Sequence, residues 1–392
     1  MSPFYRDTWV EVQLDGIYHN VKSIKEYLDP SIRIIAVVKA NAYGHGDVQV
    51  AKTAIEAGAS YLAVAFLDEA LALRKSGIKE PILVLGVIRP EDATLAAEHN
   101  ISVTVFQLDW LQLAVNHLAP RNSLNLHIKF DSGMGRLGLK TTEELNEMMT
   151  FVKSNPTMVL EGLYTHFATA DEIDTDYFDF QYAKFEVAVD FVRTVSVNAP
   201  MIHCGNSAAS LQFPTKMFHA VRLGIAMYGL SPSEEMKGLL PFPLQESFSL
   251  HSCISHVKKV SAGEKVSYGA TYTVDQEEWV GTVPIGYADG WVRSLKNREV
   301  LVNGLRMPII GRVCMDQIMI RLPNHVEVGT KVTLIGEQGQ EFISIDEIAQ
   351  EINTINYEIP CMISYRVPRV FIKNNEVIDV VNPLLHDLPL NK

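Results

Sequence analysis

The sequence contains few cysteines, and no two of them are close together. The four cysteines among 392 residues are Cys204, Cys253, Cys314 and Cys361. Small disulfide-stabilised domains and structural zinc sites need closely spaced cysteines, so both classes are excluded. We therefore expect a protein of the reducing cytoplasm that has neither a disulfide framework nor a metal site.

The sequence also lacks an excess of positive charge and long hydrophobic runs. Its 34 Lys and Arg residues are outnumbered by 46 Asp and Glu residues, which gives a net charge of −12. This balance argues against nucleic-acid binding but permits a local basic pocket for a small anion. No uninterrupted apolar run approaches the roughly 18 residues that a membrane helix needs, and the first residues show no secretory signal. We expect neither a nucleic-acid nor a membrane partner.

The first 240 residues alternate short apolar runs with segments of helical periodicity. The runs occupy residues 32–38, 61–66, 82–86, 101–106, 124–130, 159–166, 201–204 and 219–223. Continuous apolar runs are typical of buried parallel strands. Eight such steps predict an α/β fold, an N-terminal TIM-like (β/α)8 barrel over residues 1–240. The alternative is an open doubly wound sheet, but the GxGxxG turn that it needs is absent after residue 38.

The pattern changes after residue 240. Pro241 and Pro243 mark a linker, and the segments that follow are short, β-rich and separated by turns. Asn303-Gly304 predicts a tight hairpin. Ser344 and Glu347 have the spacing of a capping box, which predicts a helix over residues 344–350. We therefore expect a mostly β C-terminal domain over residues 241–392.

Candidate functional residues end or follow the predicted barrel strands, at the carboxyl ends where barrel enzymes have their active sites. They are Lys39, Lys129, Asp131, Arg136, His166, His203, Asn206, Ser207, Arg222, Gly224 and Ile225. A lysine amine in a partly dry barrel mouth can attack a carbonyl group, because desolvation lowers its pKa. The alternative for Lys39 is a lysine that reaches into solvent.

The last two strand ends carry a candidate phosphate site. The Ser207 hydroxyl and the backbone N–H groups of Gly224 and Ile225 are suitable donors, and the Tyr43 phenol could add another. The structural alternative is that Ser207 caps the helix that follows it.

Several segments carry a family resemblance that extends over nearly the whole chain. In the first 240 residues they are Val37-Val-Lys39-Ala-Asn-Ala-Tyr43-Gly-His-Gly46, His127-Ile-Lys129-Phe-Asp-Ser-Gly-Met-Gly-Arg136, Tyr164-Thr-His166, His203-Cys-Gly-Asn-Ser207 and Val221-Arg222-Leu-Gly224-Ile225. In the remaining residues they are Val266-Ser-Tyr268, Gly286-Tyr287-Ala-Asp and Cys314-Met315-Asp316. The sequence resembles the bacterial alanine racemases, and the segments after residue 240 are the more specific ones.

The resemblance implies an isomerase that interconverts L-alanine and D-alanine with pyridoxal 5′-phosphate carried on Lys39. Racemisation needs a proton-transfer group on each face of the substrate. The family pattern assigns the proton of the D-antipode to Lys39 and that of the L-antipode to Tyr268. Tyr268 is implied to enter from the second subunit of a homodimer, so that the active sites are shared. The alternative for Tyr268 is a packed aromatic residue at a strand end.

Other residues match further roles of the family. His166 and Arg222 are implied to assist Tyr268, and Arg222 is implied to face the cofactor's ring nitrogen. Arg136 matches the residue that meets the cofactor's phenolic oxygen and the substrate carboxylate. Lys129 matches a lysine that carries a carbamate in many members. The alternatives are an ion pair at the barrel bottom or surface for Arg222, a structural role for His166, and an ion pair with Asp131 for Lys129.

The residues around the substrate come mainly from the second half of the sequence. The resemblance places Tyr357 near both the phosphate and the substrate methyl group, and gives Met315 a backbone contact with substrate. Tyr287 is implied to join Tyr268 and Tyr357 in narrowing the entrance. The outer corridor is assigned to Arg293, Arg312, Ile355 and either Asp171 or Asp174. Tyrosines around the pocket favour a small side chain, although serine could react weakly.

Four other functions remain open. A racemase of broader specificity fits the same residues. A pyridoxal-phosphate barrel decarboxylase would need a carboxylate at the ring nitrogen, where Arg222 stands. A non-catalytic pyridoxal-phosphate carrier would lack the β domain, and a Schiff-base aldolase would not need the anion site. D-alanine for cell-wall peptidoglycan is the usual product of the family, but the sequence does not distinguish a biosynthetic from a catabolic role.

Overall fold

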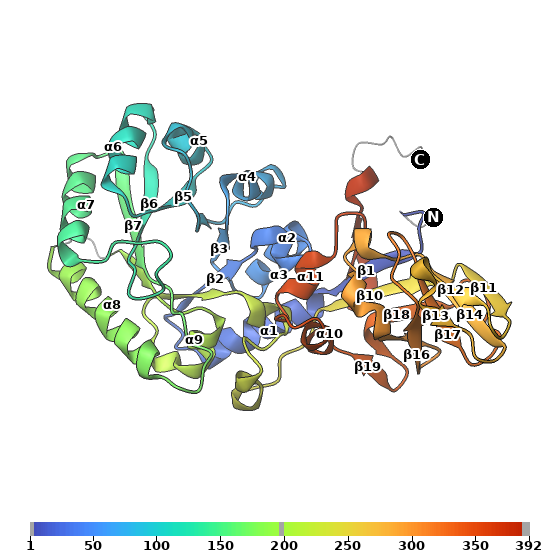
Figure 1. Cartoon of the computed structure of the whole chain (residues 1–392). Helices are drawn as coiled ribbons and strands as arrows, with labels where there is room; N and C mark the ends of the chain where they lie inside the picture. Colours follow the sequence, from blue (N-terminus) through green and yellow to red (C-terminus); the bar gives the residue numbers. More distant parts are fainter. Residues whose placement is uncertain (1–3, 196–199, 386–392) are drawn as a thin grey trace. The chain divides into compact units, whose positions relative to one another are not determined.

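The structure is a computed structural model that describes residues 4–195 and 200–385 (Figure 1). The chain divides into two compact units. The barrel unit comprises Gly16–Ala42 and Asp47–Gln245, and the β unit comprises residues up to Asp15, Tyr43–Gly46 and residues from Glu246 onward. The predicted domains, 1–240 and 241–392, include residues 1–3, 196–199 and 386–392, which lie outside the described residues.

Within the described residues, eight parallel strands form the closed barrel. They are β2 (Arg33–Val37), β3 (Tyr61–Val64), β4 (Ile82–Val84), β5 (Ile101–Val105), β6 (Leu124–Lys129), β7 (Met158–Tyr164), β8 (Met201–His203) and β9 (Ala220–Leu223). Most of their side chains are buried, as expected for continuous apolar runs. Strand β2 pairs with both β3 and β9, which closes the barrel. The predicted barrel is confirmed, and the open doubly wound sheet is wrong.

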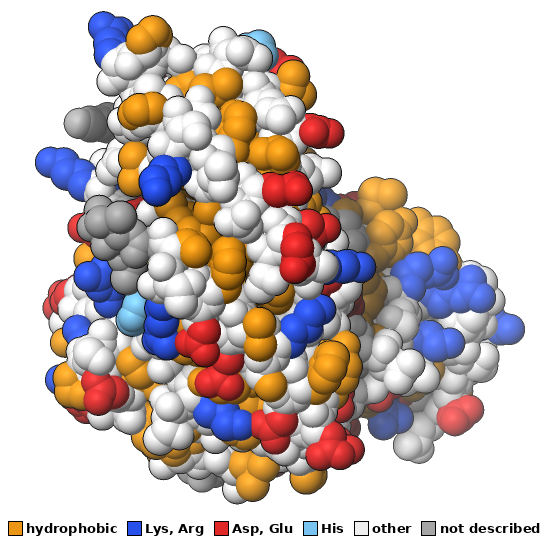
Figure 2. All heavy atoms as spheres, turned by 90° about the vertical axis from the view of Figure 1, so that its left-hand side faces the viewer, with side chains coloured by type: hydrophobic (Ala, Val, Ile, Leu, Met, Phe, Trp, Pro, Cys, Tyr) orange, Lys and Arg blue, Asp and Glu red, His pale blue; other side chains and the backbone are white. Residues whose placement is uncertain are grey.

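Helices lie outside the barrel strands (Figure 1). The helices before residue 246 are α1 (Leu14–Tyr27), α2 (Lys39–Tyr43), α3 (Asp47–Glu56), α4 (Leu67–Lys75), α5 (Ala93–Glu98), α6 (Leu108–His117), α7 (Thr142–Ser154), α8 (Asp176–Val195) and α9 (Ser207–Gln212). Figure 2 looks onto the outer face of the barrel unit, where acidic and basic side chains are interspersed. In residues 4–195 and 200–385, no helix is long and apolar enough to cross a bilayer.

The β unit is built on one large sheet. Its strands are β1 (Thr8–Gln13), β10 (Phe248–Cys253), β11 (His256–Val260), β14 (Glu278–Val283), β15 (Glu299–Val302), β16 (Leu305–Ile310), β17 (Ile318–Leu322), β18 (Lys331–Gln338), β19 (Glu341–Ile343), β20 (Arg369–Lys373) and β21 (Glu376–Val381). A separate pair contains β12 (Lys265–Val266) and β13 (Tyr272–Thr273), and two short helices are α10 (Ile345–Glu351) and α11 (Glu358–Met362). The mostly β character of this half is confirmed.

Strand β1 is the main difference from the predicted domain boundaries. Although it opens the chain, it pairs antiparallel with β10 and parallel with β20, so it belongs to the β unit. Val10 and Val12 are fully buried in that sheet. Burial of these side chains and the two ladders of backbone hydrogen bonds hold the N-terminal strand there.

Two local predictions in the β unit are confirmed. Asn303 and Gly304 have φ values of 51° and 75° and join the antiparallel strands β15 and β16. Positive φ at both central residues is the geometry that favours Asn-Gly. The Ser344 side chain accepts a hydrogen bond from the Glu347 backbone N–H at 3.0 Å and caps α10. Residues 249–260 belong to two strands, because β10 pairs with β1 and β18 whereas β11 pairs with β14.

Candidate active site

Lys39 stands at the carboxyl end of β2 and is half-buried. The four residues that follow it, Ala40 to Tyr43, all have φ between 51° and 54° and therefore form a left-handed turn. Each non-glycine residue in this conformation costs about 1–2 kcal/mol, so the surroundings must enforce it. The Ala40 N–H donates to Glu69 at 2.6 Å, and the Ala42 N–H donates to the Val38 carbonyl at 2.9 Å. The turn fixes the backbone directly after Lys39.

Arg222, on β9, is buried at the centre of a polar cluster. Its NH1 group donates to His203 Nδ1 at 2.9 Å and to the His203 carbonyl at 3.3 Å. Its NH2 group donates to the carbonyl oxygens of Thr165 and Cys204 and to His166 Nδ1. Its Nε–H has no hydrogen-bond partner among residues 4–195 and 200–385. The alternative of an ion pair at the barrel bottom or surface is therefore wrong.

The two histidines around Arg222 are held neutral. Burial lowers the pKa of His203 well below its usual value, and the charge of Arg222 lowers it further. The pKa of His166 falls for the same two reasons, with additional contributions from Lys129, Arg136 and Lys39. Burial lowers the pKa of Arg222 itself to about 10, which leaves it charged at neutral pH. The site thus combines one charged donor with two neutral imidazole acceptors.

Ser207 and Gly224 are brought together as the sequence predicted. The Ser207 hydroxyl oxygen accepts hydrogen bonds from the N–H groups of Gly224 at 3.0 Å and Ala226 at 3.3 Å. The N-cap of α9 is Asn206, whose side chain accepts from the Ala209 N–H at 2.9 Å. The alternative that Ser207 is the helix cap is therefore wrong. Because its oxygen accepts two hydrogen bonds, the Ser207 hydroxyl keeps its own proton to donate.

Lys129 ends β6 in a buried position above an aromatic ring. Its Nζ lies 4.3 Å from the ring centre of Tyr164. Burial lowers the pKa of Lys129 well below its usual value, and the charges of Arg222 and Arg136 lower it further. Arg136 itself is exposed in the loop after β6. The Asp131 carboxylate, the alternative partner of Lys129, accepts hydrogen bonds from the Gly133 and Gly135 N–H groups.

Further predicted residues lie in the β unit. Tyr43 is buried there, and its ring centre is 6.2 Å from that of Tyr357. Burial raises the pKa of Tyr43. Tyr268 is 71% exposed, so the packed aromatic alternative is wrong. Met315 is also exposed, and its carbonyl oxygen accepts from the Ala288 N–H at 3.0 Å.

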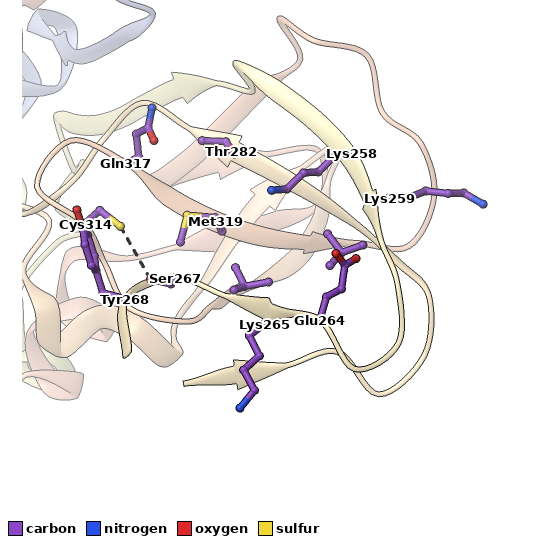
Figure 3. A pocket seen from close by; sticks show the side chains of 12 residues that line it. Lys258, Lys259, Glu264, Lys265, Ser267, Tyr268, Thr282, Cys314, Gln317 and Met319 are labelled. Atoms are coloured by element: carbon purple, nitrogen blue, oxygen red, sulfur yellow. Dashed lines mark hydrogen bonds between the residues drawn. The ribbon is translucent and has the colours of Figure 1, made fainter. Parts of the chain in front are cut away.

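Tyr268 lines a pocket of about 540 Å³ in the β unit. Figure 3 shows Tyr268 and Cys314 at one end of this pocket and Lys265 and Lys258 farther along it. Ser267, whose φ is 72°, contacts Cys314 Sγ at 3.9 Å through its hydroxyl group. The exposed Tyr268 phenol is accessible to a partner molecule.

Sequence reasoning named no role for Tyr164, His127 and Glu161. Tyr164 contacts Lys129 and Arg222 with its ring and bonds to Thr104 at 2.7 Å through its hydroxyl. Its position two residues before His166, at the end of the same strand, was the available signal. Of the two candidate aspartates for the corridor, Asp174 accepts from the Asp176 N–H at the start of α8, and Asp171 is half-buried. Which aspartate lines the corridor stays a prediction.

The sequence of this chain is similar to known protein families and to a named relative. A family model described as the alanine racemase N-terminal domain matches residues 12–232, and one described as the C-terminal domain matches residues 247–371. A protein named alanine racemase from Anoxybacillus flavithermus is 60% identical over 97% of this chain and 99% of its own length.

Two solved structures are also similar to this chain. That of alanine racemase from Bacillus anthracis with bound L-Ala-P has a TM-score of 0.95 and 54% identity, and covers 98% of this chain and 99% of its own. That of histidine racemase from Leuconostoc mesenteroides subsp. sake has a TM-score of 0.89 and 34% identity, over 95% of this chain and 99% of its own. The chain belongs to the alanine racemase family of enzymes.

Proposed function

We propose that this enzyme interconverts L-alanine and D-alanine and uses pyridoxal 5′-phosphate as its cofactor. The observation that carries the proposal is the buried Arg222, whose two terminal nitrogens are occupied and whose Nε–H is available as a donor. A permanently charged donor suits an aromatic ring nitrogen that acts as an acceptor. A decarboxylase of the same cofactor class would need a carboxylate at this position.

The donor groups of the barrel unit fit the cofactor. The Ser207 hydroxyl suits its phosphate, Arg222 suits its ring nitrogen, and the Lys39 amine suits its aldehyde. The Gly224 N–H donates to Ser207 and so orients this hydroxyl, and the Ile225 N–H completes the proposed phosphate site. In the β unit, Tyr43 and Tyr357 are the further phosphate ligands that we propose. Arg136 would meet the phenolic oxygen and the substrate carboxylate, and Met315 would contact the substrate through its backbone.

The catalytic steps of this chain are two proton transfers. The bound cofactor supplies an electron-accepting ring that makes the Cα proton of an amino acid acidic. Lys39 Nζ removes or returns this proton on the D face, and the Tyr268 hydroxyl does so on the L face. His166 is the neutral imidazole that would exchange a proton with Tyr268, and Arg222 fixes which of its nitrogens is protonated. A tyrosine of ordinary pKa, about 10, needs such help near neutral pH.

We propose that the enzyme is a homodimer with shared active sites. Tyr268, a large aromatic residue, is 71% exposed in the single chain. Met315 and Tyr365, which come later in the sequence, are also exposed. A partner subunit that buries these side chains would place Tyr268 opposite the Lys39 of the other copy. Each chain would then provide one of the two bases to each site.

Lys129 is proposed to carry a carbamate. Carbon dioxide reacts with the neutral form of an amine, and burial favours that form of Lys129. The carbamate would reverse the charge at this position and form an ion pair with Arg136. We further propose a cytoplasmic enzyme that supplies D-alanine for cell-wall peptidoglycan.

A racemase that accepts other amino acids is the second candidate. The histidine racemase among the structural neighbours has the same fold at 34% identity, so this fold supports more than one substrate. The higher identity to proteins named alanine racemase favours alanine. Serine is the nearest competitor, because rejection of one small added group is worth only about 1–3 kcal/mol.

The proposed function is tested by chiral analysis after incubation with L-alanine, L-serine or L-histidine, with and without added pyridoxal phosphate. We expect a yellow protein that converts L-alanine to the racemate much faster than the other two. Lys39→Ala should be colourless and inactive, because it removes both the attachment point and one base. A colourless, inactive wild type in the presence of added cofactor would overturn the cofactor assignment, and faster racemisation of serine or histidine would overturn the substrate.

A further inference from the structure

A continuous line of hydrogen bonds runs through the barrel interior from Arg222 to a carboxylate. Arg222 NH1 is 2.9 Å from His203 Nδ1, and His203 Nε2 is 2.9 Å from His127 Nδ1. His127 Nε2 is 3.2 Å from Glu161 Oε2. Three strands supply the links, with His127 on β6, Glu161 on β7 and His203 on β8. Both imidazole rings are fully buried.

The arginine at one end fixes the direction of every hydrogen bond. Arg222 can only donate, so His203 Nδ1 accepts and the proton of this neutral ring is on Nε2. His203 Nε2–H then donates to His127 Nδ1, and His127 must carry its proton on Nε2. That proton is donated to Glu161. The reverse order would leave His203 without a proton on either nitrogen, which is chemically unavailable near neutral pH.

Glu161 is held as a carboxylate at the far end of the line. Burial tends to raise the pKa of Glu161, but hydrogen bonds from His127, Ser102 and Tyr61 outweigh this effect and lower it. Its side chain is 28% exposed and borders a polar pocket of about 390 Å³ that Arg33 and His219 also line. The line therefore ends at a partly solvated negative charge, which two imidazole rings separate from Arg222.

Arg222 has no other counter-charge nearby. Within the described residues its acceptors are two neutral imidazoles and three backbone carbonyls, and no carboxylate lies within 4.0 Å. Hydrogen-bonded chains in a low-dielectric interior polarise one another, so a charge at one end is felt at the other. Glu161 is the residue that provides such a charge.

We propose that Glu161 is a positioning residue that acts through His127 and His203 to orient Arg222. The inference rests on the proposed function only in the role of Arg222 toward a cofactor. The hydrogen-bond direction and the two tautomers follow from the barrel unit alone. A glutamate in this position would serve both directions of the reaction equally, because the ring nitrogen is common to them.

The test compares Glu161→Gln, which keeps the acceptor oxygen but removes the charge, with Glu161→Ala, which removes both. The matched control is Glu11→Gln, because Glu11 also pairs with a buried histidine, His251 at 3.5 Å, but in the β unit. The first measurement is the ¹H–¹⁵N resonance of the buried His203 Nε2–H in the protein without cofactor, assigned with His203→Gln. The second is kcat and KM for L-alanine in the holoenzyme.

We expect the His203 resonance to shift in Glu161→Gln, although the two side chains do not touch, and to stay in place in Glu11→Gln. We expect kcat to fall by about tenfold in Glu161→Gln and further in Glu161→Ala, with KM nearly unchanged, as for other residues that orient a catalytic group. An unchanged His203 resonance in Glu161→Gln would overturn the proposal, as would an equal loss of kcat in Glu11→Gln. If the wild type racemises no alanine, the proposed function fails, and the resonance alone decides this inference.

Discussion

The two-base proposal depends on Tyr268. This side chain is exposed, and its phenolic hydroxyl is the one group on it that can transfer a proton. Tyr268→Phe removes the hydroxyl and keeps the ring. We expect kcat to fall by about 10²–10⁴, the usual contribution of a positioned acid or base. The two antipodes of alanine have equal free energies, so kcat/KM must fall by the same factor in both directions. The loss of rate alone therefore cannot assign a face.

Exchange of the Cα proton with solvent shows on which face of the substrate Tyr268 acts. In deuterium oxide, Tyr268→Phe still has Lys39, so it should exchange the Cα proton of D-alanine without racemising it. L-alanine should exchange much more slowly. The measurement is deuterium content of each antipode by mass spectrometry over time, with the wild type as control. Equal exchange of both antipodes would contradict the one-face role of Tyr268.

The sequence could predict individual site residues where a strand end exposes them, but it could not predict their connections. Lys39 and Ser207 follow apolar runs and Arg222 lies near the end of one, and their positions were predicted from that pattern. His127 lies two residues before the end of β6, and Glu161 lies inside β7. His127 opens a family segment that assigns it no role, Glu161 lies in no such segment, and the link between them depends on the register in which β6 and β7 pair.

The register in which β6 and β7 pair also explains why residue 162 is a glycine. Gly162 on β7 is the pairing partner of His127 on β6, and a Cβ atom at Gly162 would overlap the His127 ring at Nδ1. Its backbone conformation does not require glycine, so the constraint is space for the imidazole. Strand β7 thus leaves room for the ring that bonds to His203.

Gly162→Ala should therefore push the His127 ring away from His203. We expect a loss of about 1–3 kcal/mol in the free energy of unfolding, typical of overpacked interiors, together with a lower kcat. The measurements are urea unfolding and steady-state kinetics. Gly238→Ala is the control, since no atom lies within 4 Å of a Cβ built there. Full activity in a stable Gly162→Ala variant would contradict the role of this contact.

Local sequence patterns predicted the strands of the barrel better than the backbone conformation of the segments that connect them. The apolar runs placed the barrel strands within a few residues of their observed bounds, because burial on both faces marks each strand. The left-handed turn from Ala40 to Tyr43 has no such signal, since alanine is a good former of right-handed helices. Bonds to Glu69 and Val38 impose it, and only the folded barrel brings Glu69 to that turn.

At the scale of the whole molecule, pairing between distant segments decides the arrangement. Thr8–Gln13 alternates buried and half-buried residues, as a strand of a sheet with one covered face should. Its partners β10 and β20 begin more than 200 residues later, so no local pattern could assign it to the β unit. The same limit applies to the proposed dimer, because in it the partner of the exposed Tyr268 would be a second copy of the chain.

Subunit mixing tests that arrangement. If Lys39 of one subunit and Tyr268 of the other form each site, a dimer of one Lys39→Ala chain and one Tyr268→Phe chain has one doubly defective site and one intact site. Random exchange of equal amounts makes half of the dimers mixed, so about a quarter of wild-type activity should return. The measurement is the racemisation rate after mixing the two variants, with subunit exchange verified independently by mass spectrometry of labelled chains. Sites contained within single chains would restore nothing, because every site would then carry one of the two substitutions.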